Sequence, residues 1–220
     1  MFDRSSLSEQ VEVALREEIA SGRFPPGQRI AANDLKTAWN ISSTPFRDAV
    51  RALELQGFVR VEARKGIYVA PLDSSAVNEI FDLRIALECM AVERATPLVP
   101  DEEAARVRQA YLDAQKASEV RDLEPASKTD RLVHDLARNH CGNGRLQKAL
   151  ASQMELIRWV QRTINRKLPA AYVIALPEHI RIMEAICARD LEAAARAMRA
   201  HLEASRERLQ ARLPGDSQSA

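Results

Sequence analysis

The sequence has little glycine, few cysteines and no glycine-rich or low-complexity stretch. Seven glycines in 220 residues, with 46% hydrophobic and 29% charged residues, exclude a fibrous protein and indicate a folded, mostly helical one. The cysteines are odd in number, widely spaced and without a CxxC pair, so neither a disulfide framework nor a zinc ribbon is indicated.

Long hydrophobic runs are also absent. No apolar segment approaches the roughly 20 residues that span a bilayer, and the N-terminal MFDRSSLSEQ lacks the apolar core of a signal peptide. These absences predict a cytoplasmic protein without a membrane partner.

An excess of positive charge is missing as well. The formal net charge is +1, and the first 75 residues carry equal numbers of basic and acidic side chains. Any binding of nucleic acid must therefore come from local placement of charge and not from a generally basic domain.

The spacing of apolar residues predicts two domains, because it changes character near residue 71. Residues 1–71 read as three helices, about 8–20, 32–39 and 42–57, followed by a two-stranded hairpin with a basic tip. After a short linker, residues 76–210 read only as helices, at about 76–95, 101–119, 126–140, 144–166, 177–188 and 190–210. The predicted fold class is mainly α: a winged helix-turn-helix followed by an all-helical six-helix bundle.

The third helix carries the residues that suit DNA. Four of its residues, at spacings i, i+3, i+4 and i+7, lie opposite its apolar stripe: Thr44, Arg47, Asp48 and Arg51. Arg47 is the expected base reader, because a guanidinium can grip O6 and N7 of guanine together, whereas Arg51 would serve a phosphate or pair with Asp48.

Other residues of this domain suit the DNA backbone. The serines at the helix start can cap the helix, and the hydroxyls there and the free N–H groups suit a phosphate, while the hairpin tip supplies two further cations; these candidates are Ser42, Ser43, Thr44, Arg64 and Lys65. The alternative is that these are solvated charges on a small helical domain that docks another protein.

Four ionisable residues of the helical domain occupy positions where apolar residues are expected. They come from three helices and are Asp130, His134, His179 and His201. A shared divalent ion would offset the cost of burying them, and three imidazoles with one carboxylate suit Zn²⁺ or Ni²⁺ with coordination positions left open. The alternative is that each histidine is a hydrogen-bonded core residue.

Three motifs stand out in the N-terminal domain: I-x-S-G-x-x-x-P-G at 19–27, S-x-T-P-x-R at 42–47 and L-x-x-x-G-F-V at 53–59. Through these motifs the domain resembles that of the GntR family of transcription regulators. The resemblance implies that Thr44 and Arg47 contact DNA and that Gly66 permits the turn of the wing. Ser43 departs from the family, which usually carries arginine there.

The helical domain resembles the effector domain of FadR-type members of this family, called FCD, in its shorter VanR-like version. The motifs are D-L-R-x-x-L-E at 82–88, D-x-x-x-H at 130–134, E-H-x-x-I-x-x-A-I at 178–186 and D-x-x-x-A-x-x-A-M-x-x-H-L at 190–202. The resemblance implies that Asp130 and the three histidines hold a metal, and that Arg84 binds the carboxylate of a small effector.

These observations together predict a homodimeric repressor that is not an enzyme. It would bind an inverted repeat in double-stranded DNA and release it under the control of a small organic acid. Two alternatives stay open: a regulator that senses the metal itself, and a metal-dependent hydrolase that uses the open coordination positions to activate water.

Overall fold

The computed structural model describes residues 6–165 and 170–213. The chain forms two compact units. The N-terminal unit comprises Met1–Asp73 with Arg158–Thr163, and the C-terminal unit comprises Ser74–Ile157 with Ile164–Ala220.

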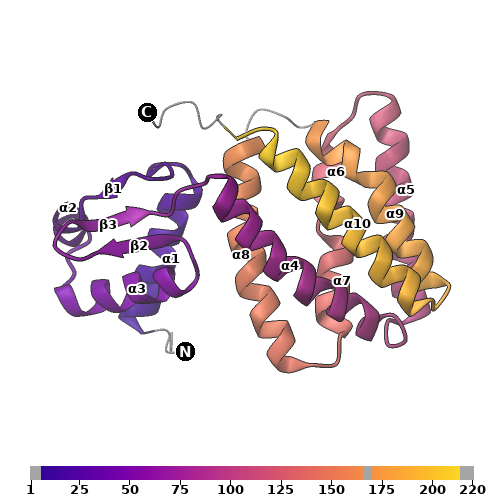
Figure 1. The fold of residues 1–220 in the computed structure, drawn as a ribbon, viewed down its shortest axis with the longest axis horizontal. Coiled ribbons are helices and arrows are strands. Elements are labelled where there is room, and N and C mark those ends of the chain that lie inside the picture. The colour runs from indigo at the N-terminus through magenta and orange to yellow at the C-terminus, as the bar shows by residue number, and fades with distance from the viewer. Residues whose placement is uncertain (1–5, 166–169, 214–220) are drawn as a thin grey trace. The chain divides into compact units, whose positions relative to one another are not determined.

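The N-terminal unit combines helices with a small antiparallel sheet (Figure 1). Its elements are α1 (Leu7–Ala20), β1 (Arg29–Ile30), α2 (Ala32–Ala38), α3 (Ser43–Leu55), β2 (Val59–Glu62) and β3 (Gly66–Val69). The strand order is β1-β3-β2, so the hairpin of β2 and β3 gains a third strand that the sequence did not predict. A strand of two residues is too short for alternation to be visible in the sequence.

The ends of these helices follow from local chemistry. The start of α1 has a capping box, in which the Ser6 hydroxyl accepts from the Glu9 amide while the Glu9 carboxylate accepts from the Ser6 amide. Ser42 stands before α3 with an extended backbone, but its side chain forms no capping hydrogen bond. The prediction that its hydroxyl caps α3 is therefore wrong, and the first amides of α3 have no such side-chain acceptor.

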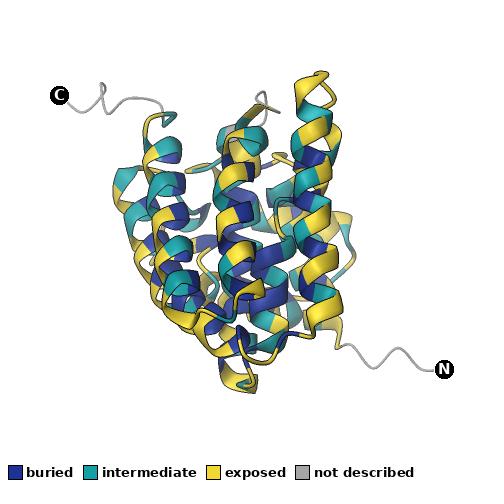
Figure 2. Cartoon of the chain, turned by 90° about the vertical axis from the view of Figure 1, so that its right-hand side faces the viewer, coloured by how far each residue is buried: buried dark blue, intermediate teal, exposed yellow. Residues whose placement is uncertain are grey.

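The C-terminal unit contains only helices among its described residues. They are α4 (Ser74–Ala95), α5 (Asp101–Glu119), α6 (Glu124–Thr129), α7 (Leu132–His140), α8 (Gly144–Asn165), α9 (Ala170–Cys187) and α10 (Leu191–Gln210), with Arg158–Thr163 of α8 assigned to the N-terminal unit. Helix α10 packs against α4 and α9, α5 packs against α9, and α7 packs against α4. Figure 2 shows buried residues along the inward faces of these helices. None of the described helices is long and apolar enough to cross a membrane.

Two helices of this unit differ from the sequence prediction. The single helix predicted over 126–140 is divided into α6 and α7 at Asp130 and Arg131, where neither glycine nor proline marks the break. The helix predicted to begin at Pro177 instead begins at Ala170, with the proline inside it. Proline removes one backbone hydrogen bond, and the buried side chains of Leu176 and Ile180 beside it hold the helix by packing.

Candidate functional site

Helix α3 presents one polar face to solvent. Its buried stripe consists of Phe46, Ala49, Val50 and Leu53, and on the opposite side all four predicted residues, Thr44, Arg47, Asp48 and Arg51, are exposed. Neither arginine forms a hydrogen bond or ion pair with any residue that the structure describes, so the alternative pairing of Arg51 with Asp48 is not formed. Both guanidinium groups are free for an external partner.

A polar hollow of about 580 Å³ adjoins the start of α3. It is lined by residues of α2 and of the turn into α3, namely Asn33, Lys36, Thr37, Asn40, Ile41, Ser42 and Ser43. The Lys36 ammonium donates to the Ser43 hydroxyl at 3.2 Å, which places a cation beside the N-terminus of α3. An ammonium and a helix N-terminus both attract anions. Lys36 was missed by the sequence analysis because it belongs to a different helix.

The wing turn depends on two residues with left-handed backbone. Arg64 has φ 64° and Gly66 has φ 132°. A Cβ atom at Gly66 would lie 2.9 Å from Nε of Arg29, whose guanidinium covers the turn. The wing therefore carries a third basic residue that the sequence analysis missed, while Lys65 lies 3.6 Å from the Glu62 carboxylate.

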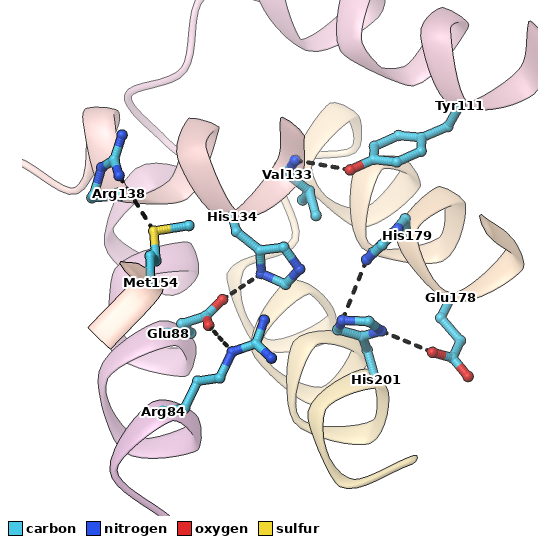
Figure 3. A network of polar contacts seen from close by, with 10 residues as sticks. All are labelled: Arg84, Glu88, Tyr111, Val133, His134, Arg138, Met154, Glu178, His179 and His201. Carbon is cyan, nitrogen blue, oxygen red and sulfur yellow. Dashed lines mark hydrogen bonds and ion pairs between the residues drawn. The ribbon is translucent and has the colours of Figure 1, made fainter. Parts of the chain in front are cut away.

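Three histidines converge inside the C-terminal unit. His134 of α7, His179 of α9 and His201 of α10 each offer a ring nitrogen, and these nitrogens all lie within 4.8 Å of one another. Nε2 of His179 is 3.3 Å from Nε2 of His201. The ring centroid of His134 lies 5.3 Å from that of His179 and 5.2 Å from that of His201. The side chains are at most 5% exposed. Figure 3 shows the three rings turned toward one another.

Carboxylates surround this cluster on its outer side. Nδ1 of His134 contacts Glu88 of α4, whose other oxygen contacts Nε of Arg84 one turn earlier on the same helix. Nδ1 of His201 lies 2.8 Å from Glu178, whose carboxylate accepts two hydrogen bonds from Arg208, at 2.7 and 2.8 Å. Both glutamates occur in the sequence motifs, but a charged residue in a helix is usually a surface residue, so their contacts could not be assigned from spacing.

The buried charges shift the pKa values of the cluster. Burial, followed by the charges of its neighbours, lowers the pKa of His179 well below its ordinary value. Burial also lowers the pKa of His201, to about 4, although the hydrogen bond to Glu178 opposes this change. Burial raises the pKa of Glu88, but Arg84 and His134 outweigh it and hold this pKa well below the ordinary value. Burial also raises the pKa of Glu178, but the hydrogen bonds and charges of His201 and Arg208 outweigh it and lower this pKa to about 2. At neutral pH, His179 and His201 are therefore uncharged imidazoles, the form that binds metal ions.

Asp130 is the one predicted ligand outside the group of three. It ends α6, whereas His134 lies in α7, so the two are not one turn apart on a single helix as predicted. Burial raises the pKa of Asp130, and the charges of His134 and Arg84 act on it in the opposite direction.

The three imidazoles fit a divalent transition ion. They are borderline ligands of the kind that Zn²⁺ and Ni²⁺ prefer. Two buried polar atoms beside the cluster, Nδ1 of His179 and Nη1 of Arg84, have no hydrogen-bond partner within the described residues. Unpaired polar atoms are costly in a protein interior, so these two atoms indicate that the site has hydrogen-bonding capacity left for a bound group.

Both halves of the chain match known protein families. Residues 7–69 match the family described as bacterial regulatory proteins, gntR family, and residues 79–204 match the FCD domain. An uncharacterized HTH-type transcriptional regulator of Bacillus subtilis is 29% identical over 89% of this chain and 87% of its own length. The HTH-type transcriptional repressor RspR of Escherichia coli is 23% identical over 90% of this chain and 86% of its own length.

Solved structures share the fold. The Escherichia coli protein McbR/YncC covers 96% of this chain and all of its own, with a TM-score of 0.72 and 21% identity. An FCD domain described as metal-free covers 66% of this chain and 98% of its own, with a TM-score of 0.56 and 22% identity. With a GntR helix-turn-helix domain followed by an FCD domain, the chain belongs to the GntR family as a DNA-binding transcriptional regulator, not an enzyme.

Proposed function

We propose that the protein is a homodimeric repressor whose hold on DNA is controlled by a small organic acid bound beside a metal ion. Residues 1–71 form the DNA-binding domain and residues 76–210 the effector domain. The observation that carries this proposal is the convergence of three buried imidazoles next to a buried arginine with an unpaired Nη1.

In the DNA-binding domain, Arg47 reads a guanine in the major groove while Ser42, Ser43, Thr44 and Arg51 contact phosphates. The exposed, unpaired guanidinium groups of α3 and the uncapped start of the helix support these roles. At the wing, Arg64, Lys65 and the backbone at Gly66 reach an adjacent phosphate or the minor groove. Two such domains in a dimer read an inverted repeat, because the symmetry of the protein is matched by that of the DNA.

In the effector domain, His134, His179 and His201 hold Zn²⁺ or Ni²⁺, and Asp130 is the fourth ligand. A bound ion of this kind supplies open coordination positions that a carboxylate can occupy. Arg84 binds the same carboxylate, since the residue is 4% exposed and its guanidinium leaves one nitrogen unpaired. The acid thereby favours an arrangement of helices in which DNA is held less tightly.

The test is a titration of operator DNA in the presence and absence of acids and metal. A duplex selected from a random pool by the wild-type protein serves as the operator, and a thermal-shift screen of organic acids supplies the effector. We expect an acid that raises the melting temperature to weaken operator binding, and Arg84→Met to abolish both effects. Operator affinity that follows the metal concentration without any acid would instead support a metal-responsive regulator.

A further inference from the structure

The histidine cluster is flanked by two arms of the same composition. In one arm Arg84 contacts Glu88, which contacts Nδ1 of His134 (Figure 3). In the other arm Arg208 contacts Glu178, which contacts Nδ1 of His201. The sequence order differs, because Arg84 and Glu88 share helix α4 whereas Arg208 lies in α10 and Glu178 in α9. The same chemical chain, from arginine to carboxylate to imidazole, is thus built twice from different elements.

Each arm determines which nitrogen of its histidine carries the proton. A carboxylate paired with an arginine is ionised and can only accept hydrogen bonds, so the ring nitrogen beside it must donate. Nδ1 of His134 and Nδ1 of His201 therefore carry hydrogen, which leaves Nε2 of each ring as the atom available to a metal ion. Nε2 of His201 is the atom that lies 3.3 Å from His179, on the side facing the cluster.

We propose that Glu88 and Glu178 are positioning residues of the metal centre: each fixes the tautomer and orientation of one histidine, so that its Nε2 is the ligand atom. This inference rests on the proposed metal site and assigns a carboxylate partner to two of its three histidine ligands. Carboxylates that accept from the far nitrogen of a ligating imidazole raise its basicity, and their loss typically weakens metal binding about 10- to 100-fold.

His179 is the exception, and it shows what the arms contribute. Its Nδ1 is buried without a hydrogen-bond partner in the described chain, so no carboxylate selects its tautomer. When no ion is bound, Nε2–H of His179 can donate to the lone pair on Nε2 of His201 across the 3.3 Å that separates them. In that tautomer His179 has to move its proton to Nδ1 before it can act as a ligand through Nε2, whereas the other two rings are already in the ligating form.

The proposal is tested first on metal-free protein labelled with ¹⁵N in its histidines. Long-range ¹H–¹⁵N spectra distinguish protonated from unprotonated ring nitrogens. We expect the Nδ1–H tautomer at His134 and His201 and the Nε2–H tautomer at His179. In Glu88→Gln the amide oxygen still accepts from Arg84, so the NH2 group faces Nδ1 of His134 and this histidine should change to the Nε2–H form. In Glu178→Gln the neutral amide oxygen holds Nδ1–H of His201 less strongly than the carboxylate does, so the Nε2–H population of His201 should rise. Unchanged tautomers in both variants would overturn the proposal, whatever the metal affinity.

The second measurement is competitive titration with Ni²⁺ alone. We expect each glutamine variant to bind Ni²⁺ 10- to 100-fold more weakly than wild type. Glu184→Gln, on the same helix as Glu178 and exposed to solvent, should bind as wild type does. Glu178 is only partly buried, so Glu178→Gln keeps the test valid if Glu88→Gln, in the core, fails to fold.

The outcomes separate the two levels of the argument. Absence of Ni²⁺ binding by the wild-type protein would overturn the proposed metal centre together with the role of the arms. Equal Ni²⁺ affinity of wild type and both glutamine variants would overturn only the positioning role. A lower melting temperature with unchanged tautomers and affinity would mean that the two glutamates merely stabilise the fold.

Discussion

Replacing Arg47 by alanine should remove sequence-specific DNA binding while leaving the fold intact. A bidentate contact between a guanidinium and guanine contributes about 1–3 kcal/mol of discrimination, so two half-sites lose about 2–6 kcal/mol. With about 1.4 kcal/mol per factor of ten, operator affinity should fall between about 30-fold and about 10⁴-fold. Because Arg47 is exposed and has no partner among the described residues, its loss should change the free energy of unfolding by no more than about 0.5 kcal/mol.

The assay is fluorescence anisotropy with the selected duplex and, in parallel, with a duplex of scrambled sequence at the same salt concentration. Arg47→Ala should bind the two duplexes almost equally, whereas wild type prefers the selected one. Arg23→Ala is the matched control, since Arg23 is also exposed in the N-terminal unit but follows α1 and pairs with Glu18. Retained preference in Arg47→Ala, or a fall in stability parallel to the loss of binding, would refute the role of Arg47 as a base reader.

Three further predictions concern metal, pH and the wing. The double substitution His134→Ala with His201→Ala should remove bound metal measured by atomic emission, and an unchanged metal content would exclude the site. In metal-free protein the pKa of His201 lies at about 4 and that of His179 is also lowered, so the unfolded state binds more protons below pH 6.5 and stability falls as pH decreases. Between pH 6.5 and 4.5 the titration of His201 alone should lower the free energy of unfolding, measured with urea, by about 2 kcal/mol, and a flat profile would contradict this. Gly66→Ala should destabilise the protein by about 1–3 kcal/mol, because alanine is strained at φ 132° and its Cβ would meet Arg29; a melting temperature equal to wild type would refute it.

The parts of the fold that local chemistry determines were predictable. The apolar stripe of α3 and the glycine after it predict both the helix and its exposed face, and the change from helical to alternating spacing at Phe58 predicts the hairpin. The break between α6 and α7 was not predictable, because residues 129–132 contain no glycine or proline. Helix α9 extends through Pro177 because packing outweighs one lost hydrogen bond, and a sequence pattern does not contain that balance.

The candidate site was predictable only in part, for a related reason. His179 and His201 stand in apolar stripes of their helices, which indicates that they point inward, and the structure brings them together with His134. The hydrogen-bond partners of the histidines were not predictable, because each glutamate contacts a histidine of a different helix: Glu88 of α4 contacts His134 of α7, and Glu178 of α9 contacts His201 of α10. Periodicity specifies which face of a helix is buried, but contacts between helices depend on how the helices pack.

The contacts of Arg84 also bear on how a small acid can control DNA binding. By linkage, an acid that weakens operator binding 100-fold must bind the DNA-bound form 100-fold more weakly than the free form, a difference of about 2.7 kcal/mol. A hydrogen bond to a charged group contributes about 1.5–3 kcal/mol, so gaining or losing one such bond in one of the two forms is sufficient. Arg84 has such a bond to Glu88, which in turn contacts His134 of α7. In the proposed mechanism an incoming carboxylate pairs with the free Nη1 of Arg84 and shares the guanidinium with Glu88, which changes the contact between α4 and α7. The small difference in free energy that regulation requires can thus arise at this one arginine.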